Sequence, residues 1–309
     1  MDIKRGLEGR VALVAGATRG AGRAIAVELA RAGAFVYATG RSSRTEGPSD
    51  MNRPETIEET GDLLRSAGGR GEAVCVDHLD VDQVRSLLQR IEGEQGRLDI
   101  LVNDIFGGDR YMEWDKPQWE HNLTGGLRML RMGVDTHLIT LFHAVPVMLR
   151  GVGGIVIEVT DGTEEFNANF RENVGFYYDL VKANVGRIVK GLAFEMRGHP
   201  ITPLGVTPGW LRSERMLEGF GVSEENWRDA LERVPGFAIS ESPTYLGRGI
   251  AALCGDLNIG RFAGTILTSR QLADIYQVTD MDGSRPDCWG MIAAMGIDYD
   301  DVQGIQAFR

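Results

Sequence analysis

Short apolar runs alternate with longer segments of helix-forming residues along most of this chain. We expect strands at residues 11–15, 34–39, 72–76, 98–102, 154–159, 204–206 and 265–268, and helices at 23–33, 61–67, 81–93, 136–149, 174–196 and 243–253. Runs this short and this apolar are typical of strands that are buried on both faces of a parallel sheet. The alternation therefore predicts an α/β fold, with a doubly wound parallel sheet of about seven strands and helices on both faces.

Three stretches interrupt this alternation. Residues 42–58 are polar and rich in turn formers, 106–126 carry aromatic residues among glycines and charges, and 210–242 are a long connection with helical pieces. Long loops in such a fold commonly serve as functional lids, and the aromatic residues favour ordered ones. With no linker or internal repeat, we expect residues 1–309 to form a single domain, with 42–58 and 106–126 as inserted loops and 270–309 as a C-terminal extension of unassigned structure.

Charge and cysteine content exclude several classes of protein. The net charge is −11 and no basic run occurs, so binding to nucleic acid or to an anionic membrane is not expected. The three cysteines lie far apart and lack metal-ligand spacing, which predicts no metal site, no disulfide framework and a cytoplasmic location. No apolar segment reaches about 20 residues, so we expect neither a signal peptide nor a membrane span.

A glycine-rich turn follows the first predicted strand. Gly16, Gly20 and Gly22 lie between this strand and the helix after it. Backbone N–H groups at a helix start bind anions, and glycines without Cβ atoms let a pyrophosphate come close. The context favours a dinucleotide-binding turn, the alternative being a tight packing turn without a ligand.

Two arginines indicate the type of dinucleotide. The second strand ends Ala38-Thr39-Gly40-Arg41, without the carboxylate that would bind a ribose 2′-hydroxyl. Arg19 and Arg41 could instead hold a 2′-phosphate through charge-assisted hydrogen bonds. We therefore expect NADP as cofactor, with NADPH preferred over NADH. The alternative is that both are solvated surface arginines.

Five ordered motifs resemble those of the short-chain dehydrogenase/reductase family, over about residues 8–270. They are the turn from Ala15 to Gly22, Asp77 after the third strand, Leu101-Val-Asn-Asp104, Tyr178-Asp-Leu-Val-Lys182, and Pro208-Gly209 with Ser213. The layout is similar to that of the subgroup called dehydrogenase/reductase member one-like. The resemblance implies a Rossmann-like fold and a cofactor site formed by Gly16, Thr18, Arg19, Gly20, Ala21, Gly22, Arg41, Asp77, His78, Asn103, Tyr178, Lys182, Pro208, Gly209 and Ser213.

The same resemblance implies hydride transfer between nicotinamide and a carbonyl or secondary alcohol. Tyr178 and Lys182 are four residues apart, so they share one helix face. A nearby ammonium lowers the pKa of a tyrosine from about 10, which suits Tyr178 as general acid and base. Thr160 occupies the position of the family's serine, and Asp161 and Thr163 are adjacent candidates for that role.

Several residues depart from the family pattern. Gly133 falls where the family has a helix asparagine, with Asp135 or His137 as possible replacements, and Asp104 and Ile105 alter the segment after the fourth strand. The alternative function is therefore an NADP(H)-binding sensor or scaffold without turnover. A nucleotide-sugar epimerase and a methyltransferase are more distant alternatives, since the tail looks too short for the first and the second needs no Tyr/Lys pair.

The expected partners are a small-molecule substrate and further copies of the chain. A bulky or apolar carbonyl or alcohol is expected, because aromatic residues fall in loops near the edge of the sheet where ligands bind. They are Phe106, Tyr111, Trp114, Trp119, Phe166, Phe170 and Trp210. These aromatics could instead form a satellite core under the loops. The family suggests a homodimer or homotetramer formed through the long helices.

Overall fold

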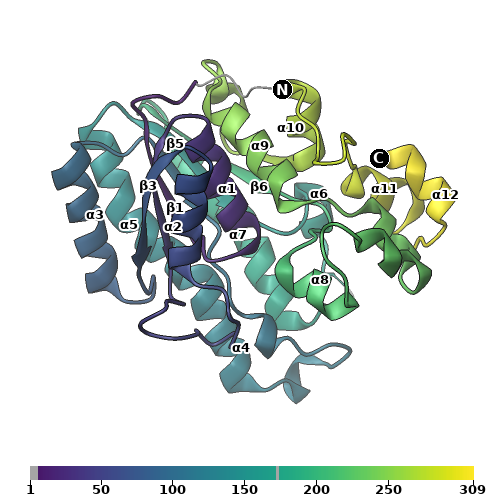
Figure 1. Ribbon diagram of the computed structural model, residues 1–309. Coiled ribbons are helices and arrows are strands. Elements are labelled where there is room, and N and C mark those ends of the chain that lie inside the picture. The colour runs from purple at the N-terminus through teal and green to yellow at the C-terminus, as the bar shows by residue number, and fades with distance from the viewer. Residues whose placement is uncertain (1–5, 172–173) are drawn as a thin grey trace.

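Seven parallel strands form a single sheet at the centre of the molecule (Figure 1). The computed structural model describes residues 6–171 and 174–309. The strands are β1 (Val11–Ala15), β2 (Phe35–Gly40), β3 (Arg70–Cys75), β4 (Ile100–Asn103), β5 (Gly154–Val159), β6 (Ile201–Thr207) and β7 (Ile266–Thr268). Their order, β3-β2-β1-β4-β5-β6-β7, confirms the predicted doubly wound sheet. The order reverses between β1 and β4, and such folds bind ligands in the crevice beyond the carboxyl ends of these strands.

Helices cover both faces of this sheet. They are α1 (Gly20–Arg31), α2 (Ile57–Ser66), α3 (Val81–Gln95), α4 (Leu123–Leu130), α5 (Thr136–Arg150), α6 (Glu164–Asn167), α7 (Phe176–Glu195), α8 (Glu214–Phe220), α9 (Pro243–Cys254), α10 (Ser269–Tyr276), α11 (Cys288–Met295) and α12 (Val302–Ile305). Side chains alternate along each strand, so Ala12 and Val14 pack with α1, α2, α9 and α10, whereas Val11 and Leu13 pack with α3, α5 and α7. This burial on both faces explains why the strands are almost continuously apolar.

Two predicted element boundaries were wrong for identifiable reasons. Helix α2 begins at Ile57, inside the predicted 42–58 insertion, because Thr56 and Glu59 form a capping box at its first turn. Strand β6 begins at Ile201 rather than at residue 204 and includes Pro203, which usually argues against a central strand. The first three residues of β6 pair only with β5, since β7 joins β6 from Gly205 onward.

Helices α4 and α5 form one continuous helix, Leu123–Arg150, of which only the part from residue 136 was predicted. A π-helical turn, Arg131–Asp135, joins them and contains Gly133. A Cβ atom on Gly133 would overlap Val181 of α7, and one on Gly126 would overlap the Tyr177 ring. These glycines therefore let the long helix pack closely against α7.

The same long helix is sufficiently long and apolar to cross a membrane, contrary to the expectation that no apolar segment reaches this length. Half of its most apolar window is buried inside the fold, as in the core helices of many soluble proteins. Its outer side exposes Leu127, Leu138 and Phe142.

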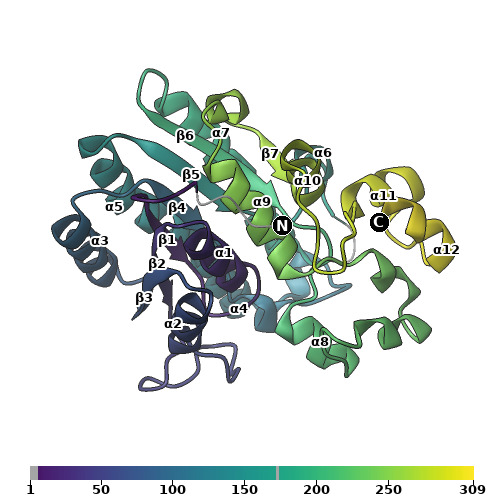
Figure 2. The same ribbon diagram turned by 45° about the horizontal axis from the view of Figure 1, so that its top comes forward.

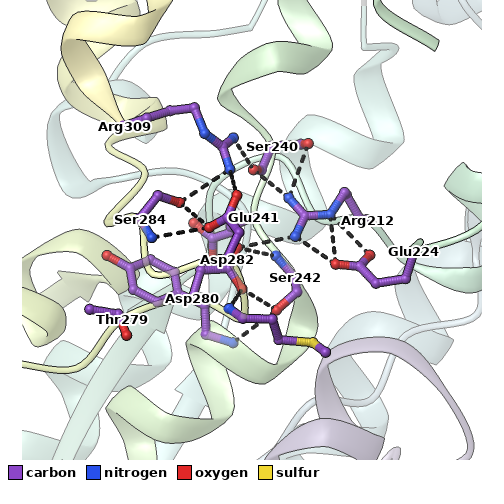
Figure 3. Close-up of polar contacts among 12 residues, drawn as sticks. Arg212, Glu224, Ser240, Glu241, Ser242, Thr279, Asp280, Asp282, Ser284 and Arg309 are labelled. Carbon is purple, nitrogen blue, oxygen red and sulfur yellow. Dashed lines mark hydrogen bonds and ion pairs between the residues drawn. The ribbon is translucent and has the colours of Figure 1, made fainter. Parts of the chain in front are cut away.

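The C-terminal extension folds into α10, α11 and α12 (Figure 2). Helices α11 and α12 pack against the 210–242 connection. One small apolar cluster joins these segments, and a second lies within the connection itself. Both clusters include Trp210 and Leu231. Buried polar contacts hold them together as well (Figure 3): Arg212 and Arg309 both donate to the carbonyl oxygen of Ser240, at 2.7 and 2.9 Å. Arg212 also pairs with the fully buried Asp280 at 3.1 Å.

Candidate active site

A cleft of about 280 Å³ lies at the carboxyl ends of β1, β2 and β4. The structure brings together seven of the predicted cofactor residues along its wall, namely Gly16, Thr18, Arg19, Ala21, Arg41, Asp77 and His78. Asp104, Phe106 and Leu211 complete parts of the same wall. The cleft therefore lies where the glycine turn and the arginines were expected to meet.

The glycine turn has a shape that other residues could not adopt. Gly16 and Gly20 have φ angles of +90° and +56°, in the region that favours glycine. A Cβ atom on Gly22 would overlap the carbonyl oxygen of Gly16. Helix α1 begins at Gly20, and the N–H group of Gly20 donates to the Glu214 carboxylate at 2.9 Å. The helix start thus binds a carboxylate of α8, as expected for an anion site.

The two cofactor arginines also lie beside carboxylates. Arg41 donates to Asp50 at 3.1 Å and lies 3.8 Å from Asp77. Arg19 lies 3.7 Å from Glu55, and its Nη1 atom is buried without a hydrogen-bond acceptor among the described residues. Burial lowers the pKa of Arg19, although Glu55 opposes that shift. A buried guanidinium nitrogen that has no hydrogen-bond acceptor among the described residues suits a phosphate ligand.

Three residues of the predicted cofactor site direct their side chains elsewhere. The His78 ring lies between the hydroxyls of Thr39 and Thr140, each 2.8 Å from a ring nitrogen. Burial lowers the pKa of His78 to about 3, so the ring is neutral and only the backbone remains for a cofactor. Asn103 donates to the buried Glu158 at 2.7 Å, and the Ser213 hydroxyl accepts the N–H of Met216 as the cap of α8. Buried polar side chains and the N–H groups at the start of a helix need hydrogen-bond partners, and these contacts supply them.

The Pro208-Gly209 loop is held by the C-terminal extension. Trp289 of α11 donates its indole N–H to the carbonyl oxygen of Pro208 at 2.7 Å. A Cβ atom on Gly209 would crowd Cys288 and Glu241. Trp289 also packs against Phe166, with ring centroids 5.0 Å apart. The sequence analysis missed Trp289, because the extension lacks the periodicity that would have placed it.

Tyr178 lies in a group of charged residues on β5, α7 and the segment between them. Its hydroxyl donates to the Asp161 carboxylate at 2.8 Å, and Arg171 donates to the same oxygen at 3.0 Å. The Arg171 side chain is only 5% exposed, whereas that of Asp161 is 39% exposed. A buried arginine therefore fixes the carboxylate, and that carboxylate still faces the open part of the site.

Thr160 points away from Tyr178. Its hydroxyl donates to the backbone carbonyl oxygen of Lys182 at 2.9 Å, which ties the end of β5 to α7. Of the two adjacent candidates, Asp161 rather than Thr163 reaches Tyr178, because Thr163 caps the short helix α6. The geometry places Asp161 where a hydroxyl was predicted.

The charges around Tyr178 oppose the predicted lowering of its pKa. Burial and then the Asp161 charge and hydrogen bond raise the pKa of Tyr178 well above its ordinary value. Burial also lowers the pKa of Lys182, whose ammonium lies 4.0 Å from the centre of the Phe106 ring. Burial alone would raise the pKa of Asp161, but Arg171 and Lys182 outweigh it and lower that pKa. Tyr178 is thus held in its protonated form.

The two proposed replacements for the helix asparagine have other partners. His137 is buried between Glu158, 2.5 Å away, and the carbonyl oxygen of Ile105, 2.9 Å away. Asp135 lies 3.6 Å from Arg131 on the partly exposed side of the helix. His137 is therefore a fully bonded core histidine that supports the segment after β4.

The predicted substrate aromatics divide into three groups. Phe106 and Tyr111 pack with Tyr177 and Tyr178 in a satellite cluster under the 106–126 loop, and Trp210 packs in the C-terminal clusters. Trp114, Trp119 and Phe170 are exposed. Phe166 packs against Trp289 with its ring tilted, and the centre of the Phe166 ring lies 5.5 Å from the Arg171 guanidinium. The satellite-core interpretation is thus correct for three of the seven.

A sheet with this order, a glycine turn before α1 and a Tyr/Lys pair on α7 define a class of nucleotide-dependent oxidoreductase. The model of the family described as short chain dehydrogenase matches residues 10–219. The chain belongs to the short-chain dehydrogenase/reductase family, whose members are oxidoreductases that use NAD(P) on CH–OH/C=O pairs.

Curated relatives place the chain more closely within this family. It is 32% identical to Dehydrogenase/reductase SDR family member 1 of Mus musculus, over 90% of this chain and 85% of the relative. It is 28% identical to the 3-oxoacyl-[acyl-carrier-protein] reductase FabG of Haemophilus influenzae, over 84% and 96% of the two chains. The first match supports the member one-like subgroup.

Solved structures agree on the fold. A 7 alpha-hydroxysteroid dehydrogenase complexed with NADH and 7-oxo glycochenodeoxycholic acid superposes with a TM-score of 0.66 at 22% identity, covering 92% of this chain and 97% of that one. A short chain dehydrogenase from Shigella flexneri complexed with NADP gives a TM-score of 0.67 at 18% identity, covering 86% and 99%.

Proposed function

We propose that this chain is an NADP(H)-dependent oxidoreductase acting on a carbonyl or secondary alcohol, with Tyr178 as its general acid and base. The observation that carries the proposal is the Tyr178 hydroxyl, which is hydrogen-bonded, partly buried and held protonated beside Lys182. A protonated phenol can donate to the oxygen of a ketone as that oxygen gains negative charge.

The residues around the glycine turn fit a nicotinamide dinucleotide. Gly16 and Gly22 leave no room for Cβ atoms, and the N–H group at the start of α1 already donates to a carboxylate. Arg19 keeps a buried nitrogen without an acceptor among the described residues. When bound, the cofactor supplies or accepts the hydride. In reduction the proton of Tyr178 goes to the substrate oxygen, and in oxidation the phenolate takes the hydroxyl proton back.

Asp161 and Arg171 would act on this step as positioning residues. The carboxylate orients the phenolic hydroxyl and Arg171 fixes the carboxylate, while Thr160 holds the backbone of α7. Lys182 supplies positive charge close to the phenol, since its ammonium lies 5.4 Å from the centre of the Tyr178 ring. We propose Tyr178 and Lys182 as the catalytic pair, with Thr160 in a supporting role through the Lys182 carbonyl.

The preference for NADPH rests on Arg19 and Arg41. Both line the cleft and no carboxylate ends β2, so a 2′-phosphate that displaces Asp50 from Arg41 would have two guanidinium groups to bind. Solved relatives of the same fold bind NADP in one case and NADH in another, so affinity for each must be measured on this chain.

The substrate would be bulky or apolar. Phe166 and Trp289 form an aromatic wall near Arg171, and Phe106 packs edge-on against Tyr178 with ring centroids 5.7 Å apart. One relative is named for a steroid substrate. It is the 7 alpha-hydroxysteroid dehydrogenase of Paraclostridium sordellii, 25% identical over 82% of this chain. Hydroxysteroids and bulky ketones are therefore the first compounds to screen.

The first prediction tests catalysis directly. Tyr178→Phe should lower turnover by about 10²–10⁴-fold, because it removes the proton donor, while cofactor affinity changes little. Turnover is followed by NADPH absorbance over a panel of ketones and aldehydes, and affinity by titration. Tyr177→Phe is the matched control, since its hydroxyl faces Gln118 and not Asp161.

Two outcomes would contradict this assignment. Unchanged turnover in Tyr178→Phe would move catalysis to another residue. Cofactor binding by the wild type without turnover over a broad panel would favour the alternative of an NADP(H)-binding sensor.

We also propose a homo-oligomer in the cytoplasm. Leu138 and Phe142 of α5 and Phe194 of α7 are exposed apolar residues on the face of these long helices, which suits contact with a second copy. The cysteines Cys75, Cys254 and Cys288 are all free, as is usual in a reducing compartment.

A further inference from the structure

Asp50, in the predicted 42–58 insertion, connects three arginines from different parts of the chain. Its carboxylate accepts hydrogen bonds from Arg41 at 3.1 Å and from Arg128 at 2.9 Å, and its backbone carbonyl oxygen accepts one from Arg110 at 2.7 Å. Burial alone would raise the pKa of Asp50, but Arg128 and Arg41 outweigh it and lower that pKa. A charged carboxylate therefore occupies the guanidinium groups that a phosphate would need.

A second carboxylate lies at the other anion position of the cleft. Glu214 accepts the N–H of Gly20 at the start of α1 and lies 3.5 Å from Arg23. In dinucleotide-binding folds this helix start receives the pyrophosphate. Asp50 and Glu214 thus lie at the expected 2′-phosphate position and pyrophosphate position, respectively.

Both carboxylates belong to segments outside the strands of the sheet. Asp50 is in the loop between β2 and α2, and Glu214 is the first residue of α8, in the long connection after β6. Their side chains are partly exposed, at 27% and 32%. Exposed and half-exposed ion pairs contribute little stability, so a ligand with more charge can replace them.

We propose that Asp50 and Glu214 are internal substitutes for the cofactor phosphates, and that Asp50 sets the preference between NADPH and NADH. The inference rests on the proposed function, because it takes NAD(P) as the ligand. A 2′-phosphate must displace Asp50 from Arg41 and Arg128, whereas NADH carries no group for this position. Either dinucleotide must displace Glu214 from Gly20.

Displacement of Asp50 also reaches the substrate side. Arg110 holds the Asp50 backbone and belongs to the 106–126 insertion, as does Phe106, which contacts both Tyr178 and Lys182. The two insertions are therefore joined at Asp50. Binding of NADPH, but not of NADH, would therefore change the environment of both insertions, 42–58 and 106–126.

The test is a pair of charge-removing variants measured by equilibrium binding. In Asp50→Asn the affinity for NADPH should rise by about threefold to tenfold, with NADH unchanged, because a competing charge is removed from one subsite only. In Glu214→Gln both affinities should rise by a similar factor. Titrations with 2′,5′-ADP check that the effect in Asp50→Asn belongs to the adenosine half of the cofactor.

Asp62→Asn is the matched control. Asp62, on α2, forms an exposed ion pair with Arg44, and the variant removes the negative charge of that pair. Asp62 does not line the cleft. Hydrogen exchange of the wild type gives a second measurement that needs no variant. Exchange in residues 43–56 and 109–122 should change with NADPH and stay unchanged with NADH.

The outcomes separate this inference from the proposed function. Equal effects of Asp50→Asn on NADPH and NADH, or weaker NADPH binding, would overturn the inference alone. Absence of binding of either dinucleotide to the wild type would overturn the proposed function, and the inference with it.

Discussion

The Tyr178 hydroxyl donates a hydrogen bond to the carboxylate of Asp161. Asp161 directly follows Thr160, whose hydroxyl was predicted to act at this position. The sequence analysis identified Tyr178 and Lys182. For the third group it predicted Thr160, with Asp161 and Thr163 as adjacent candidates, and spacing alone could not decide among them. The direction of each side chain depends on how β5 ends against α7, where the Thr160 hydroxyl bonds to the Lys182 carbonyl. Such a contact joins residues 22 positions apart and leaves no signal in local sequence.

The Asp161 carboxylate should set the pH dependence of alcohol oxidation. Oxidation needs the phenolate of Tyr178, and burial together with Asp161 raises the pKa of Tyr178, so the rate should keep rising into alkaline pH. Asp161→Asn removes the charge and should move this rise to lower pH. The measurement is kcat/KM for oxidation against pH, and an unmoved alkaline limb in the variant would contradict the argument.

Asp104 should make cofactor affinity depend on pH. Burial raises its pKa to about 7, and its carboxylate contacts Gly22 of the cofactor turn. Above this pH the residue gains a negative charge beside the bound phosphates, so the Kd for NADPH should increase as pH rises through about 7. Asp104→Asn, which removes the titrating charge, should flatten the profile. A profile that is equally steep in the variant would assign the titration to another group.

At the scale of elements, two glycines of the long helix Leu123–Arg150 have a packing role. Gly126 lies against the Tyr177 ring and Gly133 against Val181, so the long helix and α7 approach closely where Tyr178 and Lys182 are presented. Glycine in a helix interior costs stability relative to alanine, which close packing here offsets. Both glycines are visible in the sequence, but the sequence could not show that they face α7.

Alanine substitutions should separate packing glycines from permissive ones. Gly126→Ala should destabilise the fold by about 1–3 kcal/mol, because the added methyl group overlaps the buried Tyr177 ring. Gly93→Ala in α3 is the control. No described atom lies within 4 Å of its added methyl group, so stability should rise by up to about 1 kcal/mol. Thermal or denaturant unfolding measures both, and equal effects would refute the close approach.

Elements with strong periodicity were predicted well, and those fixed by distant contacts were not. Strand β5 was predicted at its observed bounds, since glycine begins it and an apolar run continues it. The start of α2 was readable from its capping box and was missed. The extension could not be assigned from sequence, because its helices are short and depend on buried contacts such as Arg212 with Asp280.

At the scale of the whole molecule, the outer face of α5 and α7 exposes apolar side chains, among them Leu138, Phe142 and Phe194. A groove of about 810 Å³ lies there between α3, α5 and α7, and Phe142 on its wall is 76% exposed. Exposed apolar surface of this kind marks interfaces, and closed symmetric oligomers are the common result.

Phe142→Glu should therefore convert the oligomer into a smaller species. The charge would be buried without a partner in the interface, which is strongly unfavourable. Light scattering coupled to gel filtration measures the mass. Leu257→Glu is the control, because Leu257 is 98% exposed and lies outside this groove. A wild type that is monomeric at micromolar concentration would refute the proposal.

The apolar clusters around Trp210 give the molecule a region that can unfold by itself. Small clusters under long connections open at lower free energy than the strands of a large core. Amides in α8 and α11 should therefore exchange before those of β1 and β4. Because Trp289 belongs to this region, the aromatic wall can be lost while the cleft beside Gly16 stays folded. Under mild heating the protein would then lose the aromatic wall, together with the Trp289 hydrogen bond that holds the cofactor loop at Pro208, before the central sheet unfolds.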